Sequence, residues 1–209
     1  MATIKALASI NPSVPFITSN DALSAFCWQR VTTARQRLKY TPQAVAKFCR
    51  AVDVRRAMGV PTEYMGHMVY IAVANLTFEE IENSSLAFIA SALHKSVTDV
   101  NNEYTVRSFA TLIANEPDRS TISFGGRFNP DTDIGSSSFA RMRIHDANFG
   151  RLGRPDHVRR PNFGPLESDI YTMPQLENGD IELLMCFTEK VFETLKADPE
   201  WAAYAQYLG

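Results

Sequence analysis

Hydrophobic residues recur every three or four positions in some stretches of this chain, which predicts helices, and every second position in others, which predicts strands. Residues 19–38 carry apolar side chains at helical spacing, with Ser19 or Asn20 as N-cap and Asp21 in the first turn. Further helices are predicted from a capping box of Thr77 with Glu80 through roughly 92 to 98, over 102–115, from Thr188 to about Ala197, and briefly from Pro199.

Strands are predicted where β-branched and aromatic residues cluster or alternate with polar ones. The predicted strands are 52–55, 66–77, 121–124 and 137–145, followed by a hairpin of 165–174 with 180–187 across a turn at 177–179. Residues 1–18 are predicted to be an irregular lead-in, because Pro12 and Pro15 break a helix. Since the strands cluster after helices instead of strictly alternating with them, the order of elements predicts an α+β fold.

The length and composition exclude several classes of protein. At 209 residues, 45% hydrophobic and a net charge of −2, the chain matches one large domain or two small ones, and not a disordered, coiled-coil or nucleic-acid-binding protein. Cys27, Cys49 and Cys186 share no CxxC spacing and are expected to be reduced thiols, with Cys27 in the core. No apolar run approaches the ~18 residues of a membrane span, and no signal pattern opens the chain, so we expect a cytoplasmic protein.

The segment from residue 134 to 155, IGSSSFARMRIHDANFGRLGRP, combines an alternating stretch with a turn at Gly150, Gly153 and Pro155. Its residues resemble the pattern (T/S)SW-x-R-x-P-I-x-D-x-DFGWG-x-P of the BAHD acyltransferases, which are CoA-dependent enzymes. The matching positions are Ser137, Ser138 and Phe139 for T-S-W, then Arg141, Ile144, His145 and Asp146, and finally Asn148, Phe149 and Gly150 for D-F-G.

Three other segments resemble the same family in the same order along the chain. The matches are Ser19–Phe26 with Trp28 to S-x-x-D-A-L-x-A-x-x-W, Asp53–Arg55 with Pro61, Tyr64 and Gly66 to D-x-R…P…Y-x-G-N, and Gly179–Glu182 to the last strand. The resemblance implies that residues 1–209 form the C-terminal lobe of a two-lobed, chloramphenicol-acetyltransferase-like fold, with a mixed β-sheet covered by helices. It also makes residues 39–50 strand-like despite their alanines.

Acyl transfer needs a general base to deprotonate the acceptor and donors for the tetrahedral oxyanion. In the family the base is the His of H-x-x-x-D-G, which belongs to the N-terminal lobe. None of the four histidines fits that spacing, since Ile71, Thr98, Phe149 and Pro161 follow four residues after His67, His94, His145 and His157. We therefore expect no catalytic residue on this chain, and an N-terminal lobe, on a separate chain or as a cleaved half, as its partner. The chain is then a cleaved or truncated product, a fragment, or a natural half-length protein with another role.

The resemblance also assigns residues to the substrate channel. Ser137, with Ser138 beside it, is the candidate hydroxyl for the reacting oxygen; the alternative is the polar face of an edge strand. Phe139 replaces Trp and loses the indole donor. His67 stands where the family has Asn and is either a channel residue or a filler at the start of a strand.

A structural ion pair of the family is altered. The D-F-G Asp normally pairs with the arginine at Arg55, but here Asn148 replaces it, so the bidentate ion pair is lost. Asp146 lies on the same face if the strand continues, and we expect Asn148 and Asp146 together to hold Arg55. Arg159 and Arg160 are expected to lie in a solvated loop, the alternative being contact with an anionic cofactor tail.

The resemblance is closest to fungal acetyltransferases of the trichothecene 3-O-acetyltransferase type. It implies transfer of an acyl group, acetyl above all, from acyl-CoA to a hydroxyl of a small secondary metabolite, without a metal, nucleic acid or membrane. The alternative is a half-length pseudoenzyme that reuses the channel for small-molecule binding or cyclisation. A lobe built to dock is expected to expose an apolar patch well above the ~300–600 Å² of a monomer.

Overall fold

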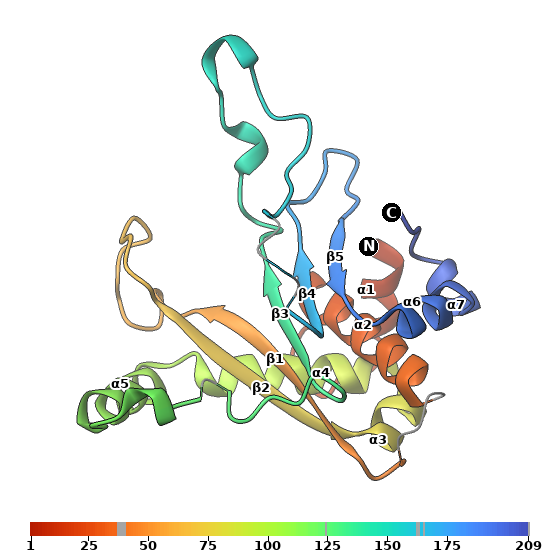
Figure 1. Cartoon of the computed structure of the whole chain (residues 1–209), viewed down its shortest axis with the longest axis horizontal. Helices are drawn as coiled ribbons and strands as arrows, with labels where there is room; N and C mark the ends of the chain where they lie inside the picture. Colours follow the sequence, from red (N-terminus) through yellow and green to blue (C-terminus); the bar gives the residue numbers. More distant parts are fainter. Residues whose placement is uncertain (37–40, 124, 162–163, 165, 209) are drawn as a thin grey trace.

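The computed structural model describes residues 1–36, 41–123, 125–161, 164 and 166–208. Five strands form one mixed sheet in the order β2-β1-β3-β4-β5, with antiparallel pairs at both sides and parallel pairs in the middle (Figure 1). The strands are β1 (Val45–Asp53), β2 (Val69–Thr77), β3 (Ile134–Ser138), β4 (Asp169–Thr172) and β5 (Leu183–Cys186). The helices are α1 (Ala2–Ala8), α2 (Ser19–Gln36), α3 (Phe78–Asn83), α4 (Leu86–Val100), α5 (Glu103–Asn115), α6 (Glu189–Lys196) and α7 (Pro199–Ala202).

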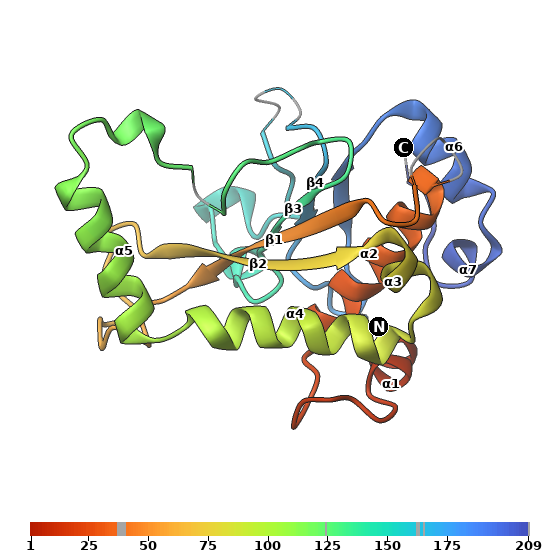
Figure 2. The same ribbon diagram turned by 90° about the horizontal axis from the view of Figure 1, so that it is seen from below.

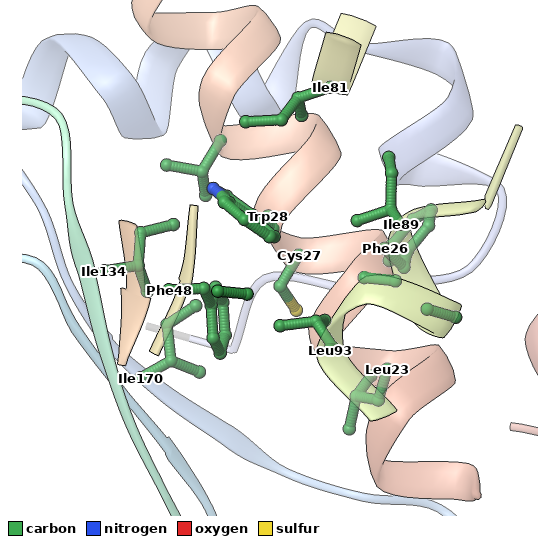
Figure 3. Close-up of a cluster of buried hydrophobic side chains, with 14 of the residues drawn as sticks. Leu23, Phe26, Cys27, Trp28, Phe48, Ile81, Ile89, Leu93, Ile134 and Ile170 are labelled. Carbon is green, nitrogen blue, oxygen red and sulfur yellow. The ribbon is translucent and has the colours of Figure 1, made fainter. Parts of the chain in front are cut away.

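The core lies between the helices and one face of the sheet. Strand β1 buries alternate side chains, among them Phe48, because successive side chains of a strand point to opposite faces. Trp28 of α2 packs on Phe48 with 5.4 Å between ring centroids. Leu93 of α4 and Ile134 of β3 complete this contact region, which Figure 3 shows as one cluster. The opposite face of the sheet is crossed by loops (Figure 2).

The sequence predicted the class of fold and most elements. The α+β class and the mixed sheet with its helices are confirmed, as is the hairpin that became β4 and β5. Residues 45–50 of the strand-like stretch 39–50 and residues 52–53 of the predicted strand 52–55 belong to one strand, β1, while residues 39–40 lie outside the described residues. No helix of the described part of the chain is long and apolar enough to cross a membrane.

Three predictions of local structure were wrong. Residues 1–18 include helix α1, which ends before Asn11 takes a positive φ and Pro12 follows. Residues 119–121 form a short 3₁₀ helix in place of the start of the strand predicted over 121–124, whose residue 124 lies outside the described residues. Finally, the N-cap of α2 is Thr18 and not Ser19 or Asn20, because Thr18 exchanges hydrogen bonds with Asp21 in the first turn.

The strand predicted over 137–145 begins and ends earlier, as β3. Ala140–Ile144 alternates apolar and basic residues, but its pairing with β4 stops at Phe139, whose N–H donates to the carbonyl of Thr172 at 2.7 Å. Beyond that point the chain leaves the sheet as a projecting segment, which we call the arm and which comprises the described residues 139–161, 164 and 166–168 (Figure 1). No strand of the described residues pairs with this alternating stretch, so it does not form a strand itself.

The predicted capping box of α3 is present. The Thr77 hydroxyl accepts from the Glu80 N–H at 3.1 Å, and the Glu80 carboxylate accepts from the Thr77 N–H at 2.7 Å. Thr188, the N-cap of α6, makes no such side-chain bond. We therefore expect Thr77→Ala to lower the free energy of unfolding by about 1 kcal/mol, measured by urea denaturation. Thr188→Ala is the matched control, and an equal loss there would contradict the capping role.

Candidate functional site

The face of the sheet opposite the helices gathers polar and reactive side chains. The strand registers align Cys49 with Gly135, Gly135 with Asp169, and Asp169 with Cys186, in one row across four strands. A second row aligns Ser137 with Tyr171 and Tyr171 with Leu184. We call this surface the open face, and its central members are Lys47, Cys49, Gly135, Ser137, Asp169, Tyr171, Leu184 and Cys186.

Ser137 lies near the end of β3 on the open face. It is half-buried, and its hydroxyl makes no hydrogen bond to another residue of the described part of the chain. Ser138 is exposed and, as the next residue of the strand, points to the other face. Phe139 is half-buried at the root of the arm. Of the two serines, Ser137 therefore has its hydroxyl on the open face and available to a ligand.

Asp169 and Tyr171 form a hydrogen-bonded pair next to Ser137. The Tyr171 hydroxyl donates to Asp169 Oδ2 at 2.5 Å, and the Arg160 guanidinium lies over the Tyr171 ring, 3.7 Å from its centroid. Burial raises the pKa of Asp169, and the charge of Arg160 opposes that rise. The pair thus places a partly desolvated carboxyl group on the open face, under an arginine from the arm.

The cysteines are poor nucleophiles in this setting. Burial raises the pKa of the Cys49 thiol, with Lys47 opposing and Asp133 adding to the rise. Burial also raises the pKa of Cys186, and the nearby Asp169 carboxylate adds to it. Cys27 is buried in the core, as expected, and burial raises its pKa to about 12. All three thiols are held in the protonated form, which is the less reactive one.

Buried polar contacts hold the loop before β3 in place. Asp133 Oδ1 accepts from the Lys47 N–H at 3.1 Å, and its Oδ2 accepts from the Asn129 N–H at 2.9 Å. Arg35 of α2 donates to the carbonyls of Asp133 and Pro130, at 3.2 and 2.8 Å. It also donates to Ser168 Oγ at 2.6 Å, just before β4. Arg35 thereby ties the starts of the two central strands, and with them Ser137 and Asp169, to the helical layer.

His67 and Arg55 lie away from these residues, in the loop between β1 and β2. His67 is exposed. The Arg55 guanidinium pairs with Asp53 at 2.9 Å and donates to the carbonyls of Tyr64 and Gly66, at 3.1 and 2.9 Å. This loop and the arm project from the sheet separately (Figure 1).

The expected contact of Arg55 with Asn148 and Asp146 is wrong. Asp146 pairs with Arg143, three residues before it, and Asn148 accepts from the N–H of Gly150 at 3.0 Å. Local partners satisfy both side chains, because residues 144–146 turn into a 3₁₀ helix and the strand that was to carry them toward Arg55 does not form. Gly150 follows with a positive φ of 63°, and Phe149 beside it is 63% exposed.

Arg159 and Arg160, which were predicted to lie in a solvated loop, both contact other side chains of the protein. Arg159 pairs with Glu182 at 2.6 Å across to the β4–β5 hairpin, and Arg160 covers Tyr171. Arg159 is exposed, as the predicted solvated loop requires, whereas Arg160 is half-buried. Within the described ranges, no three His, Cys, Asp or Glu side chains form a group that could hold a metal ion.

A cavity of about 510 Å³ lies elsewhere, between β5 and helices α1, α6 and α7. Its walls are mainly apolar and include Phe26, Leu183, Trp201 and Tyr204. None of the residues predicted for the channel lines it.

Sequence reasoning found Ser137 through its motif but missed Asp169 and Tyr171. The period-two spacing within the predicted strand 165–174 already places these two on one face. That they lie beside Ser137 depends on the parallel pairing of β3 with β4 across the arm, which no local pattern encodes.

Comparison with known proteins places this arrangement in a family. The Transferase family model matches residues 2–202. The chain is 50% identical over 202 residues to the O-acyltransferase pigD of Monascus ruber, covering 97% of this chain and 44% of pigD. It is 36% identical over 206 residues to trichothecene 3-O-acetyltransferase TRI101 of Fusarium sporotrichioides, covering 98% and 44% respectively.

The similarity extends to three dimensions. The crystal structure of F. graminearum TRI101 with coenzyme A and T-2 mycotoxin superposes with a TM-score of 0.93 at 37% identity, over 100% of this chain and 47% of TRI101. The chain thus spans about half the length of the relatives it matches.

Proposed function

Because this chain belongs to the Transferase family, the BAHD acyltransferases, we propose that residues 1–209 are the C-terminal lobe of a CoA-dependent O-acyltransferase. Its reaction is the transfer of an acyl group from acyl-CoA to a hydroxyl of a small secondary metabolite, and acetyl is the first candidate for that acyl group. The observation that carries the proposal is the match of the whole chain to TRI101 in complex with coenzyme A and T-2 mycotoxin.

The open face supplies one wall of the acceptor channel. Ser137 presents a hydroxyl that makes no hydrogen bond to the residues the structure describes, and it hydrogen-bonds the oxygen that reacts. Phe139 and His67 are also assigned to the channel, Phe139 as an apolar side chain at the root of the arm and His67 on the separate, exposed loop between β1 and β2. The general base is a His of H-x-x-x-D-G that takes the proton from the acceptor hydroxyl, and it comes from the N-terminal lobe.

The arm supports docking of that N-terminal lobe. It exposes several large apolar side chains at its surface, with Leu152 at 88%. These are Met142, Ile144, Phe149, Leu152 and Leu166. Exposed apolar side chains gathered on one segment are typical of a surface that a partner covers, and the chain matches only about half the length of its relatives. We assign the arm to the interface between lobes and Asn148, Phe149 and Gly150 to the turn at its tip.

The proposal is tested by co-expressing this chain with an N-terminal lobe that carries H-x-x-x-D-G. Affinity purification and intact mass are expected to recover both lobes together, and the pair is expected to release free CoA thiol from acetyl-CoA when an alcohol is present. A pair with the histidine replaced by alanine is the control. If the chain is monomeric beside the lobe and binds no coenzyme A, the half-length binding module replaces this proposal.

A further inference from the structure

The open face holds a carboxyl group with no part in the proposed reaction so far, that of Asp169. Its position is fixed by its neighbours on both sides. Across the β3–β4 pair stands Gly135, where a Cβ atom would lie only 1.9 Å from Asp169 Oδ1. Along β4, the Tyr171 hydroxyl donates to Oδ2 at 2.5 Å. The sheet therefore leaves room for this carboxylate and orients it.

Asp169 retains unused hydrogen-bonding capacity. A carboxylate accepts about four hydrogen bonds, and Tyr171 supplies one. Asp169 Oδ1 receives none from the side chains and backbone that the structure describes. A partly desolvated acceptor oxygen without a donor is costly, so a ligand that brings a donor to this oxygen gains binding energy.

The surrounding charges select which donor fits. The Arg160 guanidinium lies over the Tyr171 ring and is near enough to lower the pKa of Asp169 against the effect of burial. That positive charge disfavours an ammonium group beside it, and the Asp169 carboxylate repels an anionic ligand. A neutral hydroxyl is repelled by neither the Arg160 guanidinium nor the Asp169 carboxylate.

Asp169 also lies within reach of the reacting group. It is on the strand next to Ser137, two residues along on the same face, which places the two Cα positions roughly 8 Å apart, given a strand spacing of ~4.8 Å and a rise of ~3.3 Å per residue. Two hydrogen bonds to neighbouring hydroxyls of one molecule span such a gap. Building on the proposed function, we propose that Asp169, oriented by Tyr171, binds a second hydroxyl of the acceptor. The acceptor class is therefore a neutral polyol whose reacting hydroxyl has another hydroxyl close by.

The test uses the acyltransferase assembled from this chain and its N-terminal lobe, with acetyl-CoA and three probe acceptors. The probes are cis-1,2-cyclohexanediol, cyclohexanol and 3-hydroxycyclohexanecarboxylate. Thiol release gives kcat/KM for each. We expect the diol to exceed cyclohexanol by about tenfold, the value of one hydrogen bond to a charged group, and the hydroxy acid to be the poorest substrate.

Variants of Asp169 and Tyr171 test whether these two residues cause the preference for the diol. Asp169→Ala is expected to reduce the diol-to-cyclohexanol ratio to about one. Asp169→Asn, which keeps the shape and loses the charge, is expected to raise activity on the hydroxy acid about tenfold relative to the diol. Tyr171→Phe is expected to raise KM for the diol more than it lowers kcat. Asp99→Asn, at an exposed ion pair on α4, is the matched control and is expected to keep the ratio of the original protein.

The outcomes separate the two proposals. A diol preference that survives in Asp169→Ala, or a parallel fall with both neutral probes, overturns the role of Asp169 and leaves the acyltransferase function standing. Absence of transfer to every probe in the assembled protein counts against the proposed function, and the acceptor assignment falls with it.

Discussion

Replacing Arg50 with methionine is expected to lower the free energy of unfolding by about 3–5 kcal/mol, the usual cost of removing one partner of a buried ion pair. Arg50 Nη1 lies 2.6 Å from Asp21 Oδ1, and both side chains are almost completely buried. The other oxygen of Asp21 accepts from Thr18 Oγ1 at 2.7 Å and contacts His94 Nδ1 at 2.9 Å. Without Arg50 the carboxylate stays buried and loses its main counter-charge.

The loss should depend on pH. Burial alone would raise the pKa of Asp21, but Arg50 and the hydrogen bonds from Thr18 and His94 outweigh it and hold the pKa below its ordinary value. A lowered folded-state pKa contributes stability that is present above the unfolded value of about 3.9 and is lost as pH falls through the folded value. The deficit of Arg50→Met is therefore expected to be largest near neutral pH and to shrink in acid. Urea denaturation between pH 3 and 7 measures this.

Two further variants isolate the ion pair. Arg107→Met removes an exposed pair with Glu103 on α5 and is expected to cost less than about 1 kcal/mol. The double variant Asp21→Asn with Arg50→Met is expected to recover part of the loss, because no unpaired charge remains buried. A loss in Arg50→Met that does not change with pH would show that packing, and not charge, is responsible.

Ser137→Ala is expected to lower kcat of the assembled acyltransferase about 100-fold, equivalent to about 2.7 kcal/mol of transition-state stabilisation. The reason is the proposed hydrogen bond from its hydroxyl to the reacting oxygen, a bond that strengthens as charge develops there. KM for acetyl-CoA should change little, since Ser137 is assigned to the acceptor and not to the donor.

Ser138→Ala is the matched control, because it makes the same chemical change one residue along β3, where the side chain points to the other face. We expect kcat within about twofold of the original value for a surface change. Equal losses at both positions would rule out a specific role of the Ser137 hydroxyl, and thiol release under saturating acetyl-CoA decides between the two.

Sequence reasoning succeeded where the controlling interactions are local. The helical spacing of residues 19–38 and the Thr77–Glu80 capping box predicted α2 and the start of α3. The same reasoning overextended β3 because alternation describes only which face a side chain would take and not whether a neighbouring strand is present. Arg55 shows the same limit. The family pattern suggested Asn148 and Asp146 as partners, but Arg55 forms its ion pair with Asp53, two residues before it.

The candidate site was predicted in part for the same reason. Ser137 was found because its neighbours in sequence form a recognisable motif. Asp169 approaches Gly135 only through a parallel pairing that spans the whole arm, and its hydrogen-bonding need appears only when burial and partners are known. Such properties belong to the assembled sheet.

The central position of β3 has a consequence for how the chain folds. Residues 45–100 supply a β-hairpin and the helices that pack on it, all from neighbouring parts of the chain. In contrast, β3 pairs in parallel with β1 and β4, both far from it in sequence. Long loops must close before those contacts form, and such closures slow folding. During synthesis, β1 can pair with β2, but its other edge stays unpaired until β3 emerges. That edge is then a site where newly made chains can aggregate.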